Sequence, residues 1–281
     1  MAKNIKIAFI GPGMIAEAMI AGLIRTGVAH GKDLLAAGPR PERGEQLAQA
    51  YGLVYLPDNA EAARQAEVVV LSVKPQQLDK VMAGLKGSIP SKALVLSIVA
   101  GAPIQHIAAS LDHPAIVRAM PNTPARIGAG ITVWTASQAT SPEKRRQAEE
   151  ILAALGQAVY MEDEGFLDKA TALSGTGPAY VYLFMEAMVD SGVHLGFPRR
   201  VAEQLVVQTL RGSVEFYDQI EEGPRHLARL RNQVTSPGGT AAEALYYLEK
   251  AGFRTAISRA VWAAYERSIQ LGKGEAQKPP E

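Results

Sequence analysis

Two glycine-containing turns, one near each end of the chain, are the segments whose residue types and spacing suit binding chemistry. Residues 11–16 (GPGMIA) separate an apolar run from a helix-like stretch, and residues 236–239 (SPGG) directly precede an amphipathic stretch that begins at Thr240. Such turns leave backbone N–H groups without partners at the positive end of a helix dipole. The sequence therefore predicts two anion sites, one for the phosphates of a nucleotide and one for a carboxylate.

The N-terminal turn has the spacing of a dinucleotide-binding element. Gly11 would make the tight turn after a strand, and Gly13 would let the backbone approach a pyrophosphate. Ala16 takes the third-glycine position, which faces the sheet. The alternative is a glycine turn that only packs a strand against a helix.

The end of the second predicted strand bears on the choice between NADPH and NADH. An acidic side chain there would bind the free 2′-hydroxyl of NAD, but residues 36–40 (AAGPR) contain none and are followed by Arg43. The planar guanidinium of Arg40 suits a 2′-phosphate, so the sequence predicts NADPH, with NADH as the second candidate. Alternatively, Arg40 and Arg43 are solvated residues around a helix start.

Three further loops follow predicted strands, and the first two lie at the edge where open α/β sheets bind ligands. The loops are residues 74–76 (KPQ), 100–103 (AGAP) and 120–124 (MPNTP). Lys74 is predicted to line the cofactor or to form an ion pair, with a catalytic amine as the alternative. The prolines of the third loop fix their φ angles, which suits a rigid wall over a nicotinamide ring; an ordinary turn between strands is the alternative.

Composition limits the classes of function. The 281 residues include 29 basic and 28 acidic side chains, so the net charge of +1 gives no footprint for nucleic acid or an anionic membrane and favours a small neutral or zwitterionic substrate. There is no cysteine, and none of the five histidines has metal-ligand spacing, so we expect no metal site and redox chemistry from a bound cofactor. Short apolar runs and the lack of a signal-peptide pattern predict a cytoplasmic protein without a membrane span.

Apolar runs alternate with helical patterns through the first half of the chain, as in βαβ units. The predicted strands are residues 5–10, 34–37, 68–73, 94–99, 116–120, 130–135 and 158–161, and the predicted helices are 14–26, 42–51, 76–85, 104–110 and 142–155. Beyond residue 162 the pattern is helical only. The sequence thus predicts an α/β Rossmann-like N-terminal domain (1–162), an all-α C-terminal dimerisation domain (163–272) and a flexible tail (273–281).

The helical half predicts self-association. Residues 241–250 and 255–271 carry apolar side chains around much of the helix circumference. A helix that is apolar all round is buried, and in a short helical domain that burial calls for a second chain. We expect a homodimer or a larger assembly of such dimers. The alternative is a self-contained helical bundle in a single chain.

The chain resembles the pyrroline-5-carboxylate reductase family from Ile7 to about Leu271. The matching segments, in order, are FIGPGMIA, LSVKPQ, SIVAG, RAMPNTP, ALSGTGPAYVYLFMEAM, LGFPR and VTSPGGT. The resemblance implies a Rossmann-like domain, a helical domain that interlocks with its copy, and an active site built between subunits. It also implies hydride transfer from NAD(P)H to the C=N bond of Δ1-pyrroline-5-carboxylate, giving L-proline in the last step of proline biosynthesis.

The resemblance, together with the turns and loops above, gives a set of expected site residues. The predicted cofactor residues are Gly11, Pro12, Gly13, Met14, Ile15, Gly38, Arg40, Asn59, Ser72, Val73, Lys74, Pro75, Ala100 and Asn122. The predicted substrate residues are Ser236, Gly238, Gly239, Thr240 and Ala241, where the backbone N–H groups of residues 238–241 would anchor the carboxylate. The predicted catalytic groups are Thr240, the backbone of Ala241, and Thr176, which would line the substrate pocket.

The chain departs from the family pattern at one of these positions. The family usually has a threonine, thought to meet the substrate nitrogen, where this chain has Ala241. Three other functions stay open. A hydroxyacid dehydrogenase would need a general acid such as lysine, and Lys169 is the only lysine between residues 167 and 190. The second open function is a broader imine reductase, and the third is a nucleotide-sensing regulator without turnover. Ala241 is the one feature that favours the regulator.

Overall fold

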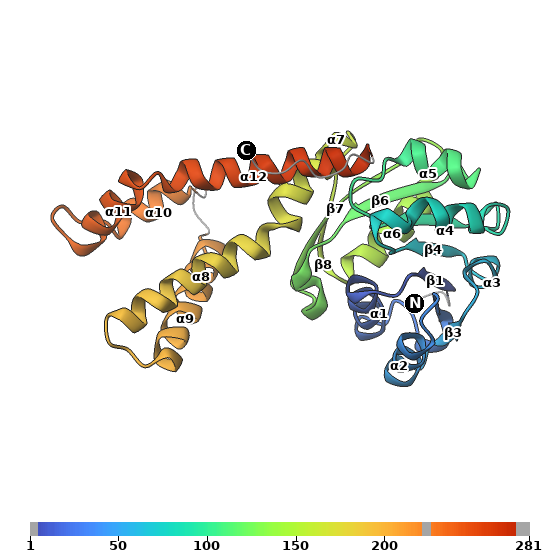
Figure 1. Ribbon diagram of the computed structural model, residues 1–281, viewed down its shortest axis with the longest axis horizontal. Helices are drawn as coiled ribbons and strands as arrows, with labels where there is room; N and C mark the ends of the chain where they lie inside the picture. The colour runs from blue at the N-terminus through green and yellow to red at the C-terminus, as the bar shows by residue number, and fades with distance from the viewer. Residues whose placement is uncertain (1–4, 221–225, 274–281) are drawn as a thin grey trace. The chain divides into compact units, whose positions relative to one another are not determined.

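The computed structural model describes residues 5–220 and 226–273 (Figure 1). The chain divides into two compact units. The sheet unit comprises residues 5–178 together with 263–273, and the helical unit comprises residues 179–262. No helix of the described residues is both long and apolar enough to cross a membrane.

The sheet unit is built around one eight-stranded sheet with the order β3-β2-β1-β4-β5-β6-β7-β8. The strands are β1 Ile7–Ile10, β2 Leu34–Ala37, β3 Val54–Leu56, β4 Val68–Leu71, β5 Leu94–Ser97, β6 Ile116–Met120, β7 Gly130–Ala136 and β8 Gly156–Tyr160. Strands β1 to β6 run parallel, and their order reverses between β1 and β4. Such a reversal opens a crevice at the carboxyl ends of the strands, where ligands bind.

Helices cover both faces of this sheet. They are α1 Met14–Arg25, α2 Pro41–Tyr51, α3 Asn59–Arg64, α4 Leu78–Leu85, α5 Ile104–Leu111, α6 Pro142–Ala153 and α7 Gly165–Ala170. Alternate residues of β1 enter different cores: Phe9 packs in the cluster that includes α1 and α6, and Ile10 in the cluster that includes α4 and α5. Burial on both faces explains why the central strands read as continuous apolar runs.

The structure corrects the predicted sheet at two places. Strand β3 and helix α3 were missed, because β3 has only three residues and lies at the sheet edge, where its side chains are partly exposed. The βαβ pattern predicted for the first half of the chain implies parallel neighbours, and this is wrong for β6 and β7, which pair antiparallel. Their connection, residues 121–129, is shorter than the dozen or so residues that a parallel crossover needs.

The described elements that follow β8 and α7 are helical. A π-helical turn, Thr171–Gly175, leads into α8 Gly177–His194, α9 Arg199–Asp218, α10 Leu227–Gln233, α11 Thr240–Lys250 and α12 Phe253–Gly272. The predicted fold class, a Rossmann-like α/β domain followed by an all-helical one, is confirmed. The compact units divide inside α8 and inside α12, whereas the predicted ranges 1–162 and 163–272 follow the chain. The predicted tail 273–281 lies outside the described residues, apart from Lys273.

The helical unit buries little apolar surface of its own. Its buried cluster consists of Val189, Ala202 and Val206. Many large apolar side chains are exposed, among them Leu183, Phe184, Val214, Phe216, Tyr246, Tyr247 and Trp262. Exposed apolar area on this scale marks an interaction surface rather than a finished globular core.

Candidate active site

The N-terminal glycine turn has the backbone geometry of a phosphate cradle. Gly11 has φ +82°, and its N–H donates to the carbonyl of Ala37 at 2.8 Å. The N–H of Gly13 donates back to the carbonyl of Gly11 at 2.7 Å, and α1 begins at the next residue with no side-chain cap. The first-turn N–H groups of α1 therefore stay open to an anion at the positive end of the helix.

Two residues after β4 support this turn directly. The Ser72 hydroxyl lies 3.0 Å from the carbonyl oxygens of both Ile10 and Gly11, to which it donates. A Cβ placed on Gly11 would lie 2.4 Å from Cγ1 of Val73, so only glycine fits against this side chain. Ser72 and Val73, directly after β4, thus shape the cradle. The same connection brings Lys74 and Pro75 to this edge of the sheet.

The two arginines near the end of β2 have different environments. Arg43 forms an ion pair with Glu17 and donates through Nε to the carbonyl of Pro12 at 3.3 Å. Burial alone would raise the pKa of Glu17, but the hydrogen bond and charge of Arg43, with the Tyr51 hydroxyl, hold that pKa below its usual value. Arg40, at the N-cap of α2, is exposed, and its guanidinium has no partner in the described part of the chain. Arg43 therefore braces the turn, and Arg40 is the cation open to a ligand.

The missed elements β3 and α3 complete this end of the site. The Tyr55 hydroxyl in β3 donates to the carbonyl of Gly38 at 2.8 Å, and a Cβ on Gly38 would lie 3.3 Å from Pro12. Asn59 is the first residue of α3, and its buried Oδ1 has no hydrogen-bond partner among residues 5–220 and 226–273. A buried acceptor of this kind calls for a donor, which the hydroxyls or amine of an adenosine can supply. No sequence signal pointed to Tyr55.

The loops after β5 and β6 carry the other predicted cofactor residues. Ala100 precedes Gly101, whose φ is +71°. Oδ1 of Asn122 accepts the N–H of Ile131 at 3.0 Å, so its amide NH₂ is the end left for a ligand. This hydrogen bond ties the loop after β6 to the start of β7.

The hydroxyl of Thr176, a predicted catalytic group, already donates a hydrogen bond at the π-helical turn. Both the N–H and the Oγ1 of Thr176 donate to the carbonyl of Thr171 at 2.8 Å. Thr176 can therefore offer an acceptor but not a proton. The neighbouring Ser174 hydroxyl donates to the carbonyl of Ala170 at 3.1 Å. Single π-turns of this kind are frequent at functional sites.

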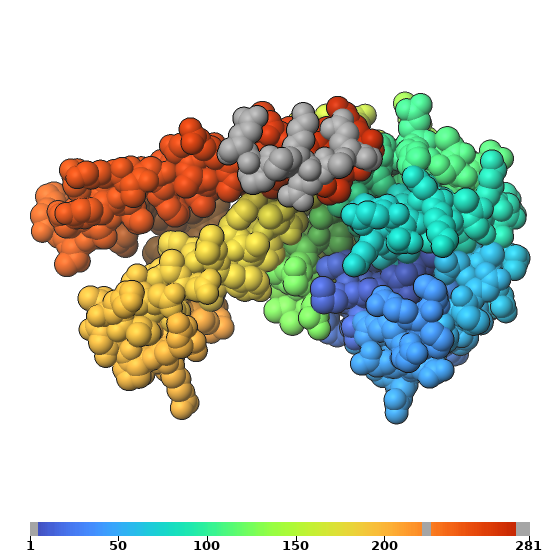
Figure 2. All heavy atoms as spheres, viewed as in Figure 1, coloured from blue at the N-terminus to red at the C-terminus, as the bar shows by residue number. Residues whose placement is uncertain are grey.

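A cavity of about 610 Å³ lies within the sheet unit, beside the loops that are predicted to bind the cofactor. It is lined by the loops after β4 and β5, by His106 of α5, and by Arg267 and Lys273 at the end of α12. In Figure 2 the red end of α12 lies beside the teal and green segments of the sheet unit. Nε2 of His106 lies at hydrogen-bond distance, 2.7 Å, from Oδ1 of Asp79, so one nitrogen of the imidazole already has a partner.

The C-terminal turn in the helical unit is a type II turn. The N–H of Gly239 donates to the carbonyl of Ser236 at 3.0 Å, Pro237 occupies the second position, and Gly238 has φ +70°. Helix α11 then begins at Thr240 without a side-chain cap. Residues 240–242 keep backbone N–H groups that have no acceptor among the described residues. The N–H of Gly239, which the sequence also assigns to the carboxylate anchor, donates within the turn, so the open donors at this point are those of residues 240–242.

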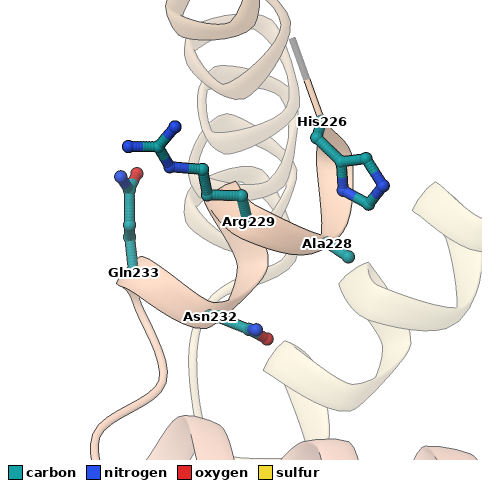
Figure 3. A pocket seen from close by; sticks show the side chains of 5 residues that line it. All are labelled: His226, Ala228, Arg229, Asn232 and Gln233. Carbon is teal, nitrogen blue, oxygen red and sulfur yellow. The ribbon is translucent and has the colours of Figure 1, made fainter. Parts of the chain in front are cut away.

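The helix before this turn lines a second depression, of about 510 Å³. Figure 3 shows Arg229 and Gln233 extending from one side of α10, and His226 and Asn232 from the other. All its lining residues belong to α10 and the residue that precedes it, so it does not enclose a ligand within one chain. The turn before α11 remains the better anion site.

A phosphate cradle at the sheet reversal, with an open buried acceptor nearby, indicates a dinucleotide-binding domain, and the family matches assign the chain to the NAD(P)H-dependent oxidoreductases. Residues 6–101 match the family described as "NADP oxidoreductase coenzyme F420-dependent". Residues 164–271 match the family described as "Pyrroline-5-carboxylate reductase dimerisation".

Relatives match over nearly the full length. The pyrroline-5-carboxylate reductase of Synechocystis sp. is 43% identical over 270 residues, which cover 96% of this chain and 99% of the relative. The one from Pseudomonas aeruginosa is 38% identical, over 95% and 97% of the two chains. The chain belongs to the pyrroline-5-carboxylate reductase family.

Solved structures agree. The crystal structure of Plasmodium falciparum pyrroline carboxylate reductase with NADP bound has a TM-score of 0.88 at 32% identity, covering 97% of this chain and all (100%) of that one. A pyrroline-5-carboxylate reductase from Coxiella burnetii gives 0.86 at 33% identity, covering 98% and 100%. The resemblance seen in the sequence and the assignment as an NAD(P)H-dependent oxidoreductase are therefore confirmed, and the hydroxyacid dehydrogenase and the non-catalytic regulator are not retained.

Proposed function

We propose that this chain transfers a hydride from NADPH to the C=N carbon of Δ1-pyrroline-5-carboxylate and so forms L-proline. Family membership supports the reaction. The structural observation that carries the substrate assignment is the uncapped start of α11, whose three open N–H groups in residues 240–242 suit a carboxylate. The predicted site residues are retained as proposals, with Arg43 and Tyr55 added as supports of the cofactor turn.

The chain's own groups mainly bind and orient. The nicotinamide, when bound, supplies the hydride, and a protonated cyclic imine is already electrophilic. The N–H groups of residues 240–242 hold the carboxylate, and the loops at residues 100–103 and 120–124 wall the ring and exclude water. Oγ1 of Thr176, whose proton is donated to Thr171, can accept the N–H of the iminium. Binding of the substrate at both its carboxylate and its iminium N–H then holds the imine carbon in place for hydride transfer.

The test of the function is NADPH oxidation followed at 340 nm with Δ1-pyrroline-5-carboxylate as substrate. We expect saturable turnover with proline as the product, identified by chromatography. A six-membered imine carboxylate tests breadth, and the same imine without its carboxylate tests the anion site. Loss of turnover on removal of the carboxylate supports the assignment; equal rates for both contradict it.

Replacing Arg40 by Ala should weaken NADPH binding more than NADH binding. The exposed guanidinium is placed to meet the 2′-phosphate, and a charge-assisted contact of this kind contributes about 1–2 kcal/mol, or roughly tenfold in Kd. Calorimetric titration with both cofactors measures the difference. Arg146→Ala, which removes an exposed arginine from α6, is the matched control and should change neither affinity. Equal losses for both cofactors with Arg40→Ala would reject the preference.

We propose that the helical segment 163–272 pairs with its copy in a homodimer, and that each active site combines the two copies. The exposed apolar side chains of α8, α9, α11 and α12 support the pairing into a homodimer. Light scattering at micromolar concentration should give at least twice the chain mass. Co-expression of Gly11→Val and Gly239→Val chains tests whether the active site is shared. If each site takes its two turns from different copies, a mixed dimer has one site in which both turns are intact; if both turns come from the same copy, it has none. A monomer with full activity would refute the shared site.

Replacing Ala241 by Thr should raise kcat/KM by roughly tenfold or less. A hydroxyl at this position would add one neutral hydrogen bond to the substrate nitrogen, and such a bond contributes about 0.5–1.5 kcal/mol. If water protonates the imine before binding, the substitution changes almost nothing and activity falls as pH rises. Ala242→Thr, one residue further along the helix, is the control and should give no gain. A gain well above tenfold would show that the hydroxyl supplies the proton.

We propose a cytoplasmic location and a site without metal.

A further inference from the structure

A buried arginine joins four elements of the sheet unit through two carboxylates. Arg118, in β6, is only 4% exposed. Its Nη1 lies 2.9 Å from Oε1 of Glu164, and its Nη2 lies 3.0 Å from Oδ1 of Asp168. The same two oxygens accept further hydrogen bonds: Glu164 from the N–H of Ile104 at 2.8 Å, and Asp168 from the hydroxyl of Ser268 at 2.8 Å. The cluster therefore links β6, α7, the start of α5 and the end of α12.

Both loops proposed to wall the nicotinamide are attached to this cluster. Strand β6 ends two residues after Arg118 and continues into the loop at residues 120–124. Helix α5 begins at Ile104, directly after the loop at residues 100–103. The rigid planar fork of one guanidinium thus sets the direction of both carboxylates and, through them, the spacing of the two loops.

The end of α12 touches one of these loops a second time. A Cβ placed on Gly101 would lie 2.7 Å from the nitrogen of Gly272, and a Cβ on Gly272 would lie 2.3 Å from the carbonyl oxygen of Gly101. Backbone therefore meets backbone at this point, with no room for a side chain. Ser268, which is 2% exposed, lies one helical turn earlier and is hydrogen-bonded to the cluster.

Stability alone gives a weak account of this arrangement. One buried guanidinium faces two carboxylates whose side chains are 33% and 20% exposed, so the cluster has a net charge of −1 in a partly buried position. Ion pairs that are withdrawn from water often stabilise a fold no more than apolar residues of the same volume. What the cluster does provide is fixed geometry between segments that are far apart in the sequence. That geometry is required where two loops must hold one flat ring.

We propose that Arg118 and Ser268 are positioning residues for the nicotinamide half of the cofactor. They act through Glu164 and Asp168, which hold the loops at residues 100–103 and 120–124 at a set distance. The adenosine half is bound elsewhere, at the turn after β1 and the ends of β2 and β3. Loosening the cluster should therefore weaken contacts to the nicotinamide and spare those to the 2′-phosphate end. The inference rests on the proposed use of NADPH.

The experiment compares two ligands on folded variants of the full chain. NADPH carries both halves, whereas 2′-phospho-ADP-ribose lacks the nicotinamide. For Ser268→Ala we expect NADPH binding to weaken about threefold to tenfold in calorimetric titration, with 2′-phospho-ADP-ribose changed by less than about twofold. For Arg118→Lys, which keeps the charge but loses the fork, the NADPH loss should be larger and kcat should fall by roughly ten- to a hundredfold. The fluorescence of bound NADPH should shift toward that of the free cofactor.

The matched control is Ser213→Ala in α9, where an exposed serine hydroxyl donates to the carbonyl of Thr209 at 2.7 Å. It should change neither affinity. If Arg118→Lys does not fold, Ser268→Ala decides alone, because it removes one hydroxyl and leaves both ion pairs. Equal weakening of both ligands, or no weakening of NADPH in a folded variant, overturns the proposal. The binding readouts need no imine, so failed turnover of Δ1-pyrroline-5-carboxylate would contradict the proposed function and leave this inference standing.

Discussion

Replacing Gly11 by Val should reduce NADPH affinity and kcat/KM by roughly 100-fold or more, equivalent to about 2.7 kcal/mol. Gly11 has φ +82°, a conformation that costs residues with a Cβ about 1–2 kcal/mol. A Cβ there would also lie 2.4 Å from Cγ1 of Val73 and 3.2 Å from its backbone nitrogen. Relief of that overlap has to move the turn, and the turn places the open N–H groups at the start of α1.

The affinity is measured by titration of NADPH fluorescence, and thermal unfolding shows whether the fold survives. Gly27→Val is the matched control. Gly27 also has a positive φ, +71°, but a Cβ placed there meets no atom within 4 Å, so it carries the strain without the collision. We expect this control to lose some stability and to keep its cofactor affinity. Similar affinities for the two variants would show that the turn after β1 does not bind the pyrophosphate.

Replacing Gly239 by Val should lower kcat/KM for Δ1-pyrroline-5-carboxylate by roughly 100-fold or more, mainly through KM, and leave NADPH affinity unchanged. Gly239 has φ −83°, so backbone strain is not the cause. A Cβ at this position would lie 2.5 Å from Oγ and 3.1 Å from the carbonyl oxygen of Ser236. The branched side chain would therefore disturb the type II turn and obstruct the approach to the N–H groups of residues 240–242.

Steady-state kinetics with the imine varied at saturating NADPH give KM and kcat separately. Gly84→Val, at an exposed position in α4 where a Cβ meets nothing within 4 Å, is the control and should leave both constants near their starting values. Full activity in Gly239→Val would place the carboxylate elsewhere. A loss confined to kcat, with KM unchanged, would mean that the turn acts on the reaction step rather than on capture of the substrate.

Local sequence patterns were enough to predict the turns and most of the elements around them. Gly11 and Gly238 stand where the backbone has φ +82° and +70°, a requirement that a residue type meets by itself. The central strands, buried on both faces, are continuous apolar runs, and α6 begins after Ser141 with a proline in its first turn, as predicted. These features depend on a residue and its near neighbours, so the chain alone determines them.

Pairing between distant segments could not be predicted in this way. Arg40 and Arg43 are the same residue type three positions apart, yet within the described residues only Arg43 is paired, with Glu17 of another helix and with the carbonyl of Pro12. Likewise, the open acceptor of Asn59 exists because the surrounding elements bury it without a donor. The direction of β7 depended on how far a short connection can reach, which strand patterns do not encode.

The Arg118 cluster is the clearest case of what only the tertiary structure decided. Its ion pairs join residues 46 and 50 positions apart in the chain, and Asp168 meets Ser268 across 100 positions. The contact between Gly101 and Gly272 spans a still longer stretch. Residue type and local spacing specify which conformations a segment can adopt, but which charges neutralise one another and which backbones touch is settled only when the packed sheet and helices bring those segments together.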